Sequence, residues 1–385
     1  MNNIIKENTL WINDTWKKVD KKLKKIAVKS RDKLPYTTIN GVHDDKSSTF
    51  VDWWTNGFWG GMMWLMYNAT GNEEYKITAQ NSERLLDNAL KDYKKLHHDV
   101  GFMWHLTSGA NYRLTGDMAA YNKNLYAAAT LASRYNIDGR YIRAWNNAWD
   151  NMDPSGWTII DCMMNIPLLY WASREIGDDR FKKIAMAHAD MAIRDHIRED
   201  GSVVHIAEHN TETGECVKVY GGQGYSETSC WTRGLAWAVY GYALSYIHTR
   251  KDEYLQTAIK VADYFCEKIK EYNYKSPVDF DAPCTPEYFD STAGVCTACG
   301  LLEIAKLVPE EKTKLYAQTA INLLKATDEF FCNYDETEDS IVQMGTERYP
   351  HNDKDLKGTH IPIIYGDFFF VEALCKLKNI DFLIW

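Results

Sequence analysis

The chain has 385 residues, 45% of them apolar and 25% charged, which is the composition of a folded globular protein and excludes extensive disorder. Lys and Arg number 44 against 53 Asp and Glu, so the formal net charge is −9 and a broad basic surface for nucleic acid is not expected. Aromatic residues reach 13%, which favours flat stacking surfaces inside a cleft.

The first predicted element is an amphipathic helix over Thr9–Ser30, and a repeated junction then recurs along the chain. At each junction an apolar helix runs into a short polar turn, and an amphipathic helix begins directly afterwards. Gly at such a turn is typical of a helix C-cap, and Asn or Asp after it is typical of an N-cap. The junctions are Tyr67–Tyr75, Leu114–Asp117, Glu175–Phe181, His248–Tyr254 and Leu307–Glu311.

The helices on the two sides of these junctions differ in polarity. Those before the turns are apolar almost all round, which predicts burial on every side. They are a short segment before Leu114 and the ranges Trp54–Tyr67, Trp157–Glu175, Glu227–Ile247 and Ser291–Leu307. Those after the turns have one apolar face, which predicts half-exposed outer helices at Tyr75–Leu90, Tyr121–Tyr135, Phe181–Ile197, Tyr254–Ile269 and Lys314–Phe330.

Two helices remain without a partner in this scheme, the apolar one at Tyr365–Lys378 and the amphipathic one at the N-terminus. Pairing them closes a ring of six helical hairpins, an all-α (α/α)6 barrel that occupies residues 1–385 as a single domain. The short turns then lie on one face and the long connections on the other. Because long loops on a rigid scaffold carry function, we expect the site at that second face.

Signals for other locations or partners are weak. The N-terminal residues lack a secretory signal and no apolar run approaches about 18 residues, so we expect a cytoplasmic protein without a membrane partner. The nine Cys are an odd number, and several lie in apolar helical segments, which predicts reduced core thiols. Cys296 and Cys299 have the spacing of a redox or zinc pair but lack a second pair, so we expect no metal there.

Asp161 is the strongest candidate for chemistry because it interrupts an apolar inner segment, Trp157–Trp171. Burial of an unpaired carboxylate favours its protonated form. A carboxylic acid that keeps its proton near neutral pH is what a general acid requires. The alternative is a structural Asp that caps a broken helix or pairs with Arg.

Asp99, in the stretch His97–Trp104, opens another inner helix from a long connection. As an N-cap it would accept backbone N–H bonds, which favour its ionised form. An ionised carboxylate beside a protonated one is the pattern that separates an acid from a base or stabilising group. A plain cap without a catalytic role is the alternative.

Several further residues are candidates for binding a ligand. Arg233 lies in the apolar stretch Val219–Trp237 and needs an anion, either Asp161 or a ligand carboxylate. His205 and His209 have the spacing of some zinc ligands, but in loop-like sequence a hydrogen bond to a polar ligand is the better hypothesis. Trp side chains could stack on sugar rings or fill the core: Trp53, Trp54, Trp104, Trp145 and Trp149. Together these residues indicate a carbohydrate site, with an acidic sugar favoured.

Five stretches of the sequence resemble the unsaturated glucuronyl hydrolases, glycoside hydrolase family 88, and the resemblance extends from about residue 53 to the C-terminus. The stretches are Trp-Trp-Thr-Asn-Gly-Phe-Trp-Gly-Gly, His-His-Asp-Val-Gly-Phe, Ile-Ile-Asp-Cys-Met-Met-Asn-Ile-Pro-Leu-Leu-Tyr-Trp-Ala, Gly-Gln-Gly-Tyr-Ser with Trp-Thr-Arg-Gly-Leu-Ala-Trp, and Tyr-Gly-Asp-Phe-Phe-Phe-Val-Glu-Ala-Leu. Members of this family are (α/α)6 barrels, which agrees with the ring of hairpins above.

The resemblance implies a reaction on the products of polysaccharide lyases, whose terminal uronic acid carries a C4=C5 double bond. The residue matching Asp161 donates a proton to C4, water adds at C5, and the resulting hemiketal collapses to expel the rest of the oligosaccharide. The residue matching Asp99 orients or tunes this step. No metal or organic cofactor is implied.

The resemblance also implies which residues contact the substrate. Trp53 would stack on it, and the sugar or its carboxylate would be contacted by His98, His205, Gln223 and Arg233. The implied cleft aromatics are Trp145, Trp231 and Trp237. Family members that prefer sulfated fragments carry an Arg just before the Gln loop and a Ser-x-x-Ser-x-Lys pattern, whereas this chain has Gly221-Gly222 and Asn352–Lys357 there. Strong sulfate recognition is therefore not expected.

Three other interpretations remain open from the sequence. One is an unsaturated rhamnogalacturonyl hydrolase acting on pectin fragments, which shares the barrel and the hydration chemistry. Another is a conventional inverting glycosidase with the two Asp as acid and base. The third is a sugar-binding protein without catalysis. The sequence fixes neither the linkage, nor the leaving sugar, nor the oligomeric state.

Overall fold

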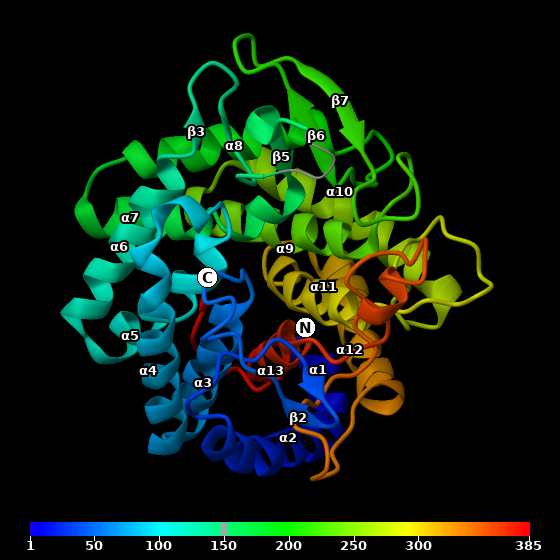
Figure 1. The fold of residues 1–385 in the computed structure, drawn as a ribbon. Coiled ribbons are helices and arrows are strands. Elements are labelled where there is room, and N and C mark those ends of the chain that lie inside the picture. The colour runs from blue at the N-terminus through cyan, green and yellow to red at the C-terminus, as the bar shows by residue number, and fades with distance from the viewer. Residues whose placement is uncertain (148–151) are drawn as a thin grey trace.

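The computed structural model describes residues 1–147 and 152–385, and these form a predominantly helical ring (Figure 1). The inner segments of the ring are α3 (Asn56–Thr70), η3 (Gly101–His105) with α5 (Ser108–Thr115), η5 (Ile160–Met164) with α7 (Pro167–Ile176), α9 (Thr232–Thr249), α11 (Ser291–Ile304) and α13 (Ile364–Leu377). The outer helices are α2 (Thr9–Lys29), α4 (Glu73–Leu86), α6 (Met118–Ala132), α8 (Arg180–His196), α10 (Asp252–Lys268) and α12 (Glu310–Phe330). A short α1 (Asn2–Glu7) precedes them.

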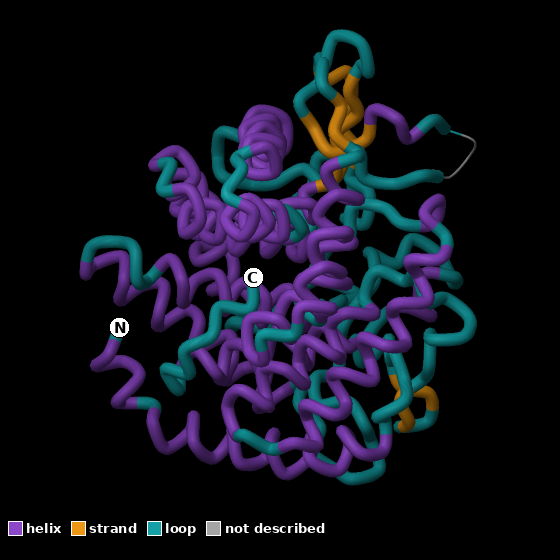
Figure 2. The backbone as a smooth tube through the Cα atoms, turned by 90° about the vertical axis from the view of Figure 1, so that its left-hand side faces the viewer, coloured by secondary structure: helices purple, strands orange, loops and turns teal. Residues whose placement is uncertain are grey.

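Packing between the ends of the chain closes the ring. α13 contacts α11 on one side and α3 on the other, and α2 covers α13 from outside. Around the rest of the ring α3 contacts η3 and α5, η3 contacts α7, and α9 contacts both α7 and α11. The predicted (α/α)6 arrangement of six inner and six outer segments is thus present in the described residues, with helices crossing the molecule in both views (Figures 1 and 2).

The helix junctions follow the predicted capping chemistry. Gly71, Gly116 and Gly177 end α3, α5 and α7 in the left-handed conformation, where an L side chain would be strained. After the first two turns, the side chains of Asn72 and Asp117 accept backbone N–H bonds and begin α4 and α6. Local sequence therefore determines where each of these hairpins turns.

The prediction of a single inner helix over Trp157–Glu175 is wrong for the first half of this range. β5 (Trp157–Ile159) pairs with β6 (Ile206–His209), which pairs with β7 (Cys216–Tyr220) in an antiparallel three-stranded sheet. The chain then makes the 3-10 turn η5, and the α-helix begins at Pro167, whose fixed φ suits a first helical position. The all-α prediction included no strand in this region.

The other elements are short and lie in the connections. Two-stranded hairpins are formed by β1 (Thr38–Ile39) with β2 (Val42–His43) and by β3 (Tyr135–Asn136) with β4 (Tyr141–Ile142). The remaining 3-10 turns are η1 (Asp87–Lys91), η2 (Tyr93–Lys95), η4 (Pro154–Gly156), η6 (Ile269–Tyr272) and η7 (Asp355–Gly358). The three-stranded sheet and the β3–β4 hairpin project from one end of the ring (Figure 2).

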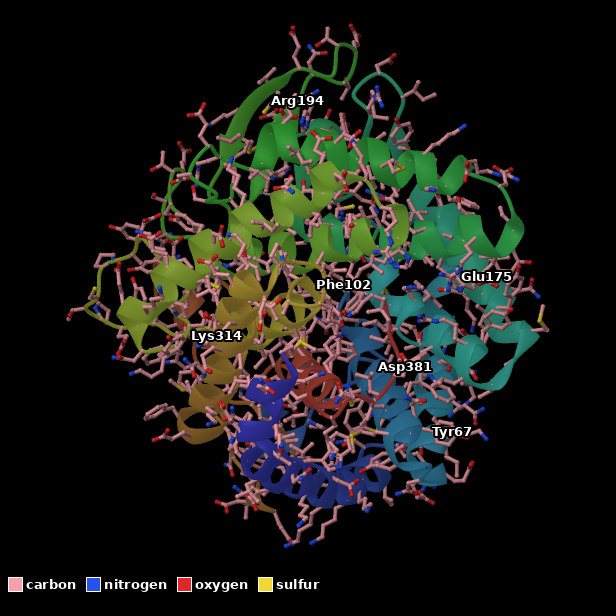
Figure 3. The ribbon with its side chains drawn as sticks, turned by 180° about the vertical axis from the view of Figure 1, so that it is seen from behind. Tyr67, Phe102, Glu175, Arg194, Lys314 and Asp381 are labelled. Atoms are coloured by element: carbon pink, nitrogen blue, oxygen red, sulfur yellow. The ribbon has the colours of Figure 1, made fainter. Side chains whose placement is uncertain are left out.

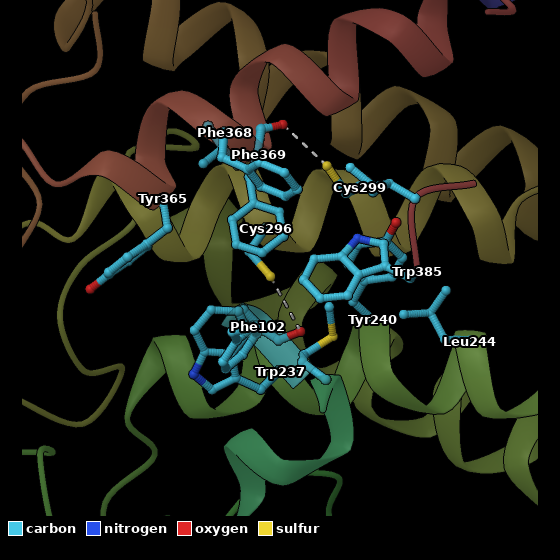
Figure 4. Close-up of a cluster of buried hydrophobic side chains, with 14 of the residues drawn as sticks. Phe102, Trp237, Tyr240, Leu244, Cys296, Cys299, Tyr365, Phe368, Phe369 and Trp385 are labelled. Atoms are coloured by element: carbon cyan, nitrogen blue, oxygen red, sulfur yellow. Dashed lines mark hydrogen bonds between the residues drawn. The ribbon is translucent and has the colours of Figure 1, made fainter. Parts of the chain in front are cut away.

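Aromatic side chains from several inner segments fill the centre of the ring (Figure 4). The Trp237 ring lies 5.4 Å from Phe102 and 5.7 Å from Phe369, and Trp385 stacks on Phe369. The Trp385 indole also donates a hydrogen bond to Glu372, which satisfies its buried N–H. Viewed from behind, Phe102 lies near the middle of the ring, and Lys314 on α12 lies near its edge (Figure 3).

The nine Cys are free thiols, and Cys296 and Cys299 are buried on α11. Their sulfurs face the carbonyls of Ala236 and Phe369, so each is used in packing between inner helices. None of the helices in the described parts of the chain has both the length and the apolar character that a bilayer crossing needs.

One buried carboxyl makes the stability of the fold depend on pH. Glu83 on α4 accepts hydrogen bonds from Trp64 and Asn111, yet burial raises its pKa to about 7. Glu83 therefore keeps its proton in the folded state at pH values where the same carboxyl in the unfolded chain, with a pKa of about 4.5, has lost it. The stability that this group contributes is therefore lost as pH rises from about 4.5 to about 7.

We expect urea unfolding at pH 5 and pH 8 to separate this effect from others. From pH 5 to pH 8 the free energy of unfolding of wild type should fall by up to about 3 kcal/mol more than that of Glu83→Gln, because the variant cannot ionise at this position. The exposed Glu329→Gln is the control and should follow wild type. Equal pH dependence in wild type and Glu83→Gln would contradict the assignment.

Candidate functional site

The candidate site is a cleft of about 740 Å³ that gathers polar and aromatic side chains from the long connections. Most of the residues that line it lie in the connections between the α-helices, where the site was predicted, and Arg233 lies at the start of α9. They are Trp53, Trp54, His97, Asp99, Trp145, Ile159, Asp161, His205, Tyr220 to Glu227, Trp231, Arg233, Arg348 and His351. Both predicted carboxylates are among them.

Asp161 reaches the cleft because the chain changes from strand to 3-10 turn at this point. Ile160 donates its backbone N–H to the carbonyl of His205, which anchors the end of β5 to the next strand. The Asp161 carboxyl then lies almost buried at the cleft wall, with Oδ1 3.5 Å from His205 Nε2. Oδ1 is a buried atom that accepts no hydrogen bond from the described residues.

The orientation of His205 follows from its other ring nitrogen. Nδ1 accepts a hydrogen bond of 3.0 Å from the backbone N–H of Gln223, so the proton of a neutral ring lies on Nε2, the atom that faces Asp161. The ring also packs against Trp231, with 4.4 Å between the ring centres. His205 therefore presents an N–H toward the carboxyl and the cleft.

Gly222 makes this arrangement possible. Its φ is +62°, and a Cβ at this position would lie 2.0 Å from His205 Nδ1. Only Gly can adopt this conformation and leave room for the imidazole. The Gly-rich sequence before Gln223 therefore serves to seat a His.

Asp99 is held in a different environment from Asp161. Burial would raise its pKa, but His98 and His97 overcome that effect and hold the pKa well below its usual range. The two imidazoles approach Oδ2 at 3.3 and 3.1 Å, and the amide of Asn165 donates to Oδ1 at 3.0 Å. At neutral pH Asp99 is a carboxylate.

The prediction that the Asp99 side chain caps a helix is wrong. Its backbone carbonyl accepts the N–H of Met103, as a residue at a helix start does, but the carboxylate accepts no backbone N–H from the described residues. The segment that follows is a single π-helical turn, which carries the Asp99 side chain toward the cleft and its histidine neighbours. The ionised state was predicted correctly, and its cause was not.

Arg233 has the anion that the sequence required, and that anion is Asp290. The guanidinium forms an ion pair with this carboxylate and donates to the carbonyls of Thr346 and Glu347. Asp290 raises the pKa of Arg233 against the opposing effect of burial. Both side chains of the pair are buried. Because Arg233 pairs with Asp290, the alternative pairing of Arg233 with Asp161 is not observed.

The cleft includes most of the other residues predicted to bind substrate. Trp53, Trp145 and Trp231 line it, and Trp53 is the most exposed of the three. Gln223 lines it as well, although its amide donates to the carbonyl of Glu347. Trp54 also lines the cleft.

Three of the predicted aromatic and histidine positions lie elsewhere. Trp237 and Trp104 are buried core residues that do not line the cleft, because the inner helices need large side chains at their centre. His98 is fully buried behind Asp99, and its neighbour His97 faces the cleft instead. Trp149 lies outside the described residues.

Some residues of the cleft were not found from the sequence. Tyr220 ends β7 and Tyr225 lies in the loop around Gln223. Arg348 and His351 come from the segment before α13. Arg348 is exposed and has no hydrogen bond or ion pair with any described residue. These residues join the cleft because Tyr349 donates its backbone N–H to the carbonyl of Gln223, a contact between distant loops that local sequence does not signal.

The zinc-like spacing of His205 and His209 does not bring the two rings to one site. His209 lies outside the cleft, where it bonds to Asp195 and to the carbonyl of Gly156. Cys216 lies close to this pair, but Asp195 is already engaged by Arg194. His97 and His98 converge on Asp99, and their pairing with that carboxylate accounts for the cluster.

The sequence relatives of the chain and the solved structures that it matches belong to the same kind of enzyme. No family model matches the chain. It is 34% identical over 334 residues to an unsaturated glucuronyl hydrolase from Bacillus sp. (strain GL1), covering 85% of this chain and 86% of the relative. It is 32% identical to an unsaturated chondroitin disaccharide hydrolase from Streptococcus pyogenes, covering 84% and 80%.

Solved structures agree with these sequence relatives. The crystal structure of the Bacillus sp. GL1 enzyme has a TM-score of 0.85 at 30% identity and covers 94% of this chain and 97% of that one. An unsaturated glucuronyl hydrolase described as specific for heparin has a TM-score of 0.82 at 25% identity, covering 96% and 97%. An aspartate-to-asparagine variant of the Streptococcus agalactiae enzyme, complexed with dGlcA-GalNAc6S, has a TM-score of 0.79 at 25% identity, covering 97% and 94%.

The close approach of Gly222 to His205 leads to a prediction about side-chain placement. Gly222→Ala should lose about 1–2 kcal/mol of stability from its positive φ and should also displace the His205 ring. Gly177→Ala is the matched control, because its φ is +66° and nothing lies within 4 Å of the added Cβ. Melting temperatures and imidazole nitrogen NMR shifts would test this. A His205 resonance that is unchanged in Gly222→Ala would contradict it.

Proposed function

Because this chain belongs to the unsaturated glucuronyl hydrolases, a family of glycoside hydrolases, we propose that its cleft binds the terminal 4,5-unsaturated uronic acid of a lyase-generated oligosaccharide. The reaction is hydration of the vinyl ether. Protonation of C4 and addition of water at C5 give a hemiketal, which opens the ring and expels the remaining sugar with its oxygen protonated. The atoms of one water molecule are consumed in each turnover.

Asp161 is the proposed proton donor. Protonation at carbon needs an acid that meets the substrate directly, and Asp161 lines the cleft, with its buried Oδ1 accepting no hydrogen bond from the described residues. After it has given its proton to C4, the carboxylate faces the His205 N–H, which stabilises the new charge. This nearly buried carboxyl, whose Oδ1 accepts no hydrogen bond from the described residues, is the observation that carries the proposal.

Asp99 is the proposed partner carboxylate. Its depressed pKa keeps it ionised, so it accepts a hydrogen bond from the attacking water or from a sugar hydroxyl and orients that group. His98 acts through Asp99, because it is buried behind it. The two carboxyls therefore differ in environment, which suits one acid and one stabilising base.

The rest of the cleft is assigned to substrate binding. Trp53, Trp145 and Trp231 offer ring faces to the sugars. Polar contacts to the uronate come from Gln223, from His205 and from the guanidinium of Arg233, which Asp290 holds in place. Trp237 supports this wall from the core. We propose that residues 1–385 form one catalytic domain that works in the cytoplasm without a metal or organic cofactor, and without nucleic acid or membrane partners.

We propose glycosaminoglycan-derived disaccharides as the substrate class, because relatives carry the names of chondroitin disaccharide and heparin enzymes. The Gly221-Gly222 sequence and the absence of the Ser pattern favour unsulfated leaving sugars. A panel of sulfated and unsulfated lyase products, followed by loss of the ultraviolet band of the conjugated double bond, tests this. Pectin-derived products in the same panel test the rhamnogalacturonyl alternative.

The variant Asp161→Asn should abolish turnover, with a loss of at least about 1,000-fold in kcat, because an amide cannot donate a proton to carbon. The substitution is nearly isosteric, so substrate binding and melting temperature should change little. The matched control is Asp195→Asn, which alters a carboxyl that is 6% exposed and lies outside the cleft. Activity of Asp161→Asn near wild type would exclude the assignment and favour a non-catalytic sugar-binding protein.

The absorbance assay also separates hydration from conventional glycoside hydrolysis. Hydration destroys the conjugated double bond and abolishes its ultraviolet band. An inverting glycosidase would instead cleave saturated substrates as well, because breaking the glycosidic bond does not need the double bond, and the band would be lost only after release, when the free sugar opens to its keto form. Cleavage of saturated substrates, or release of sugar ahead of loss of the band, would contradict the proposed reaction.

A further inference from the structure

Asn165 lies at the point where the two carboxylate-bearing segments meet. It follows η5, four residues after Asp161, and its side chain is fully buried. It is not among the residues that line the cleft. Any effect of Asn165 on a bound substrate must therefore pass through a neighbouring residue.

The amide of Asn165 uses both of its ends on the Asp99 segment. Oδ1 accepts the backbone N–H of Phe102 at 2.8 Å, and this fixes which way the amide faces. Nδ2 then donates to Asp99 Oδ1 at 3.0 Å and lies 3.4 Å from the carbonyl of Asp161. One side chain thus ties the Asp99 segment to the Asp161 segment.

The contact requires an unusually close approach of the two chains. A Cβ at Gly101 would lie 2.6 to 2.7 Å from the backbone and Oδ1 of Asn165. Gly101 is therefore the residue that lets Asn165 reach across.

The hydrogen bond from Asn165 complements those around the other carboxylate oxygen. His97 and His98 approach Asp99 Oδ2, whereas Asn165 binds Oδ1. With both oxygens engaged, the plane of the carboxylate has a single orientation relative to Asp161. A catalytic carboxylate that rotates by a fraction of an ångström loses much of its effect.

We propose that Asn165 is a positioning residue that holds the Asp99 carboxylate in its working orientation relative to Asp161. This inference rests on the proposed function, because it presumes that Asp99 takes part in turnover. The alternative is that Asn165 only satisfies the buried N–H of Phe102, which is a structural role.

The variant Asn165→Asp separates the two roles. It keeps the shape and an oxygen for the Phe102 N–H, but replaces the donor to Asp99 with a second carboxylate oxygen. We expect kcat to fall roughly 10- to 100-fold with KM within about twofold of wild type. A purely structural role predicts a lower melting temperature and an unchanged kcat.

A matched control is available in Asn111→Asp. Asn111 also accepts at its oxygen, from Thr115, and donates from its amide to a buried carboxylate, Glu83, away from the cleft. It should lose stability as Asn165→Asp does and keep the kcat of wild type. If both variants lost kcat equally, general destabilisation would explain the loss and the proposal would be wrong.

A double variant tests whether the effect passes through Asp99. Adding Asn165→Ala to Asp99→Asn should lower kcat by less than twofold. The single variant Asn165→Ala should lower the kcat of the wild-type protein at least about 10-fold. Multiplicative losses would overturn the positioning role. Full activity of the single variant Asp99→Asn would show that the proposed function of Asp99 is wrong. Loss of activity in Asp99→Asn together with wild-type activity in Asn165→Asp would refute only the positioning role of Asn165.

Discussion

Packing of α13 against α3 is the constraint on which the remaining architecture depends. The inner segments are apolar around most of their circumference, so each is stable only with neighbours on both sides and an outer helix behind it. The last inner helix meets these conditions by returning to the first, with α2 behind it. Closure therefore couples the two ends of the sequence and holds the connections at the mouth of the ring in fixed relation.

The mouth differs from the rest of the ring because two inner segments are irregular there. One is a π-helical turn after Asp99, and the other is a strand and 3-10 turn around Asp161. Regular helices would keep these side chains on a packed face. The irregular backbone instead directs both carboxyls toward one cleft, and it is joined across the gap by Asn165 and Gly101. Among the inner segments described, loss of regular α-helix is thus confined to the place where polar groups must converge.

Sequence reasoning found the elements that depend on local patterns. Helix periodicity and the capping residues at Gly71, Gly116 and Gly177 gave the hairpins and the closed ring, and an Asp in apolar sequence gave the cleft carboxyl. It failed where contacts between distant segments decide the outcome. The anion for Arg233 is Asp290, 57 residues away, and Trp237 resembles a cleft aromatic in sequence but faces the core. No local pattern distinguishes these cases, since tertiary packing sets them.

The Arg233–Asp290 pair also bears on how substrate arrives. Since the guanidinium is neutralised by its own carboxylate, it adds little long-range attraction for an anionic sugar, and the protein as a whole carries a net charge of −9. An approaching uronate therefore meets a weak repulsive field from the net charge, and Arg348 rather than Arg233 offers a cation without an ion pair among the described residues at the cleft. Added salt shortens the Debye length and screens that repulsion. Encounter with this enzyme should accordingly be faster at higher ionic strength, the reverse of the behaviour of electrostatically steered enzymes.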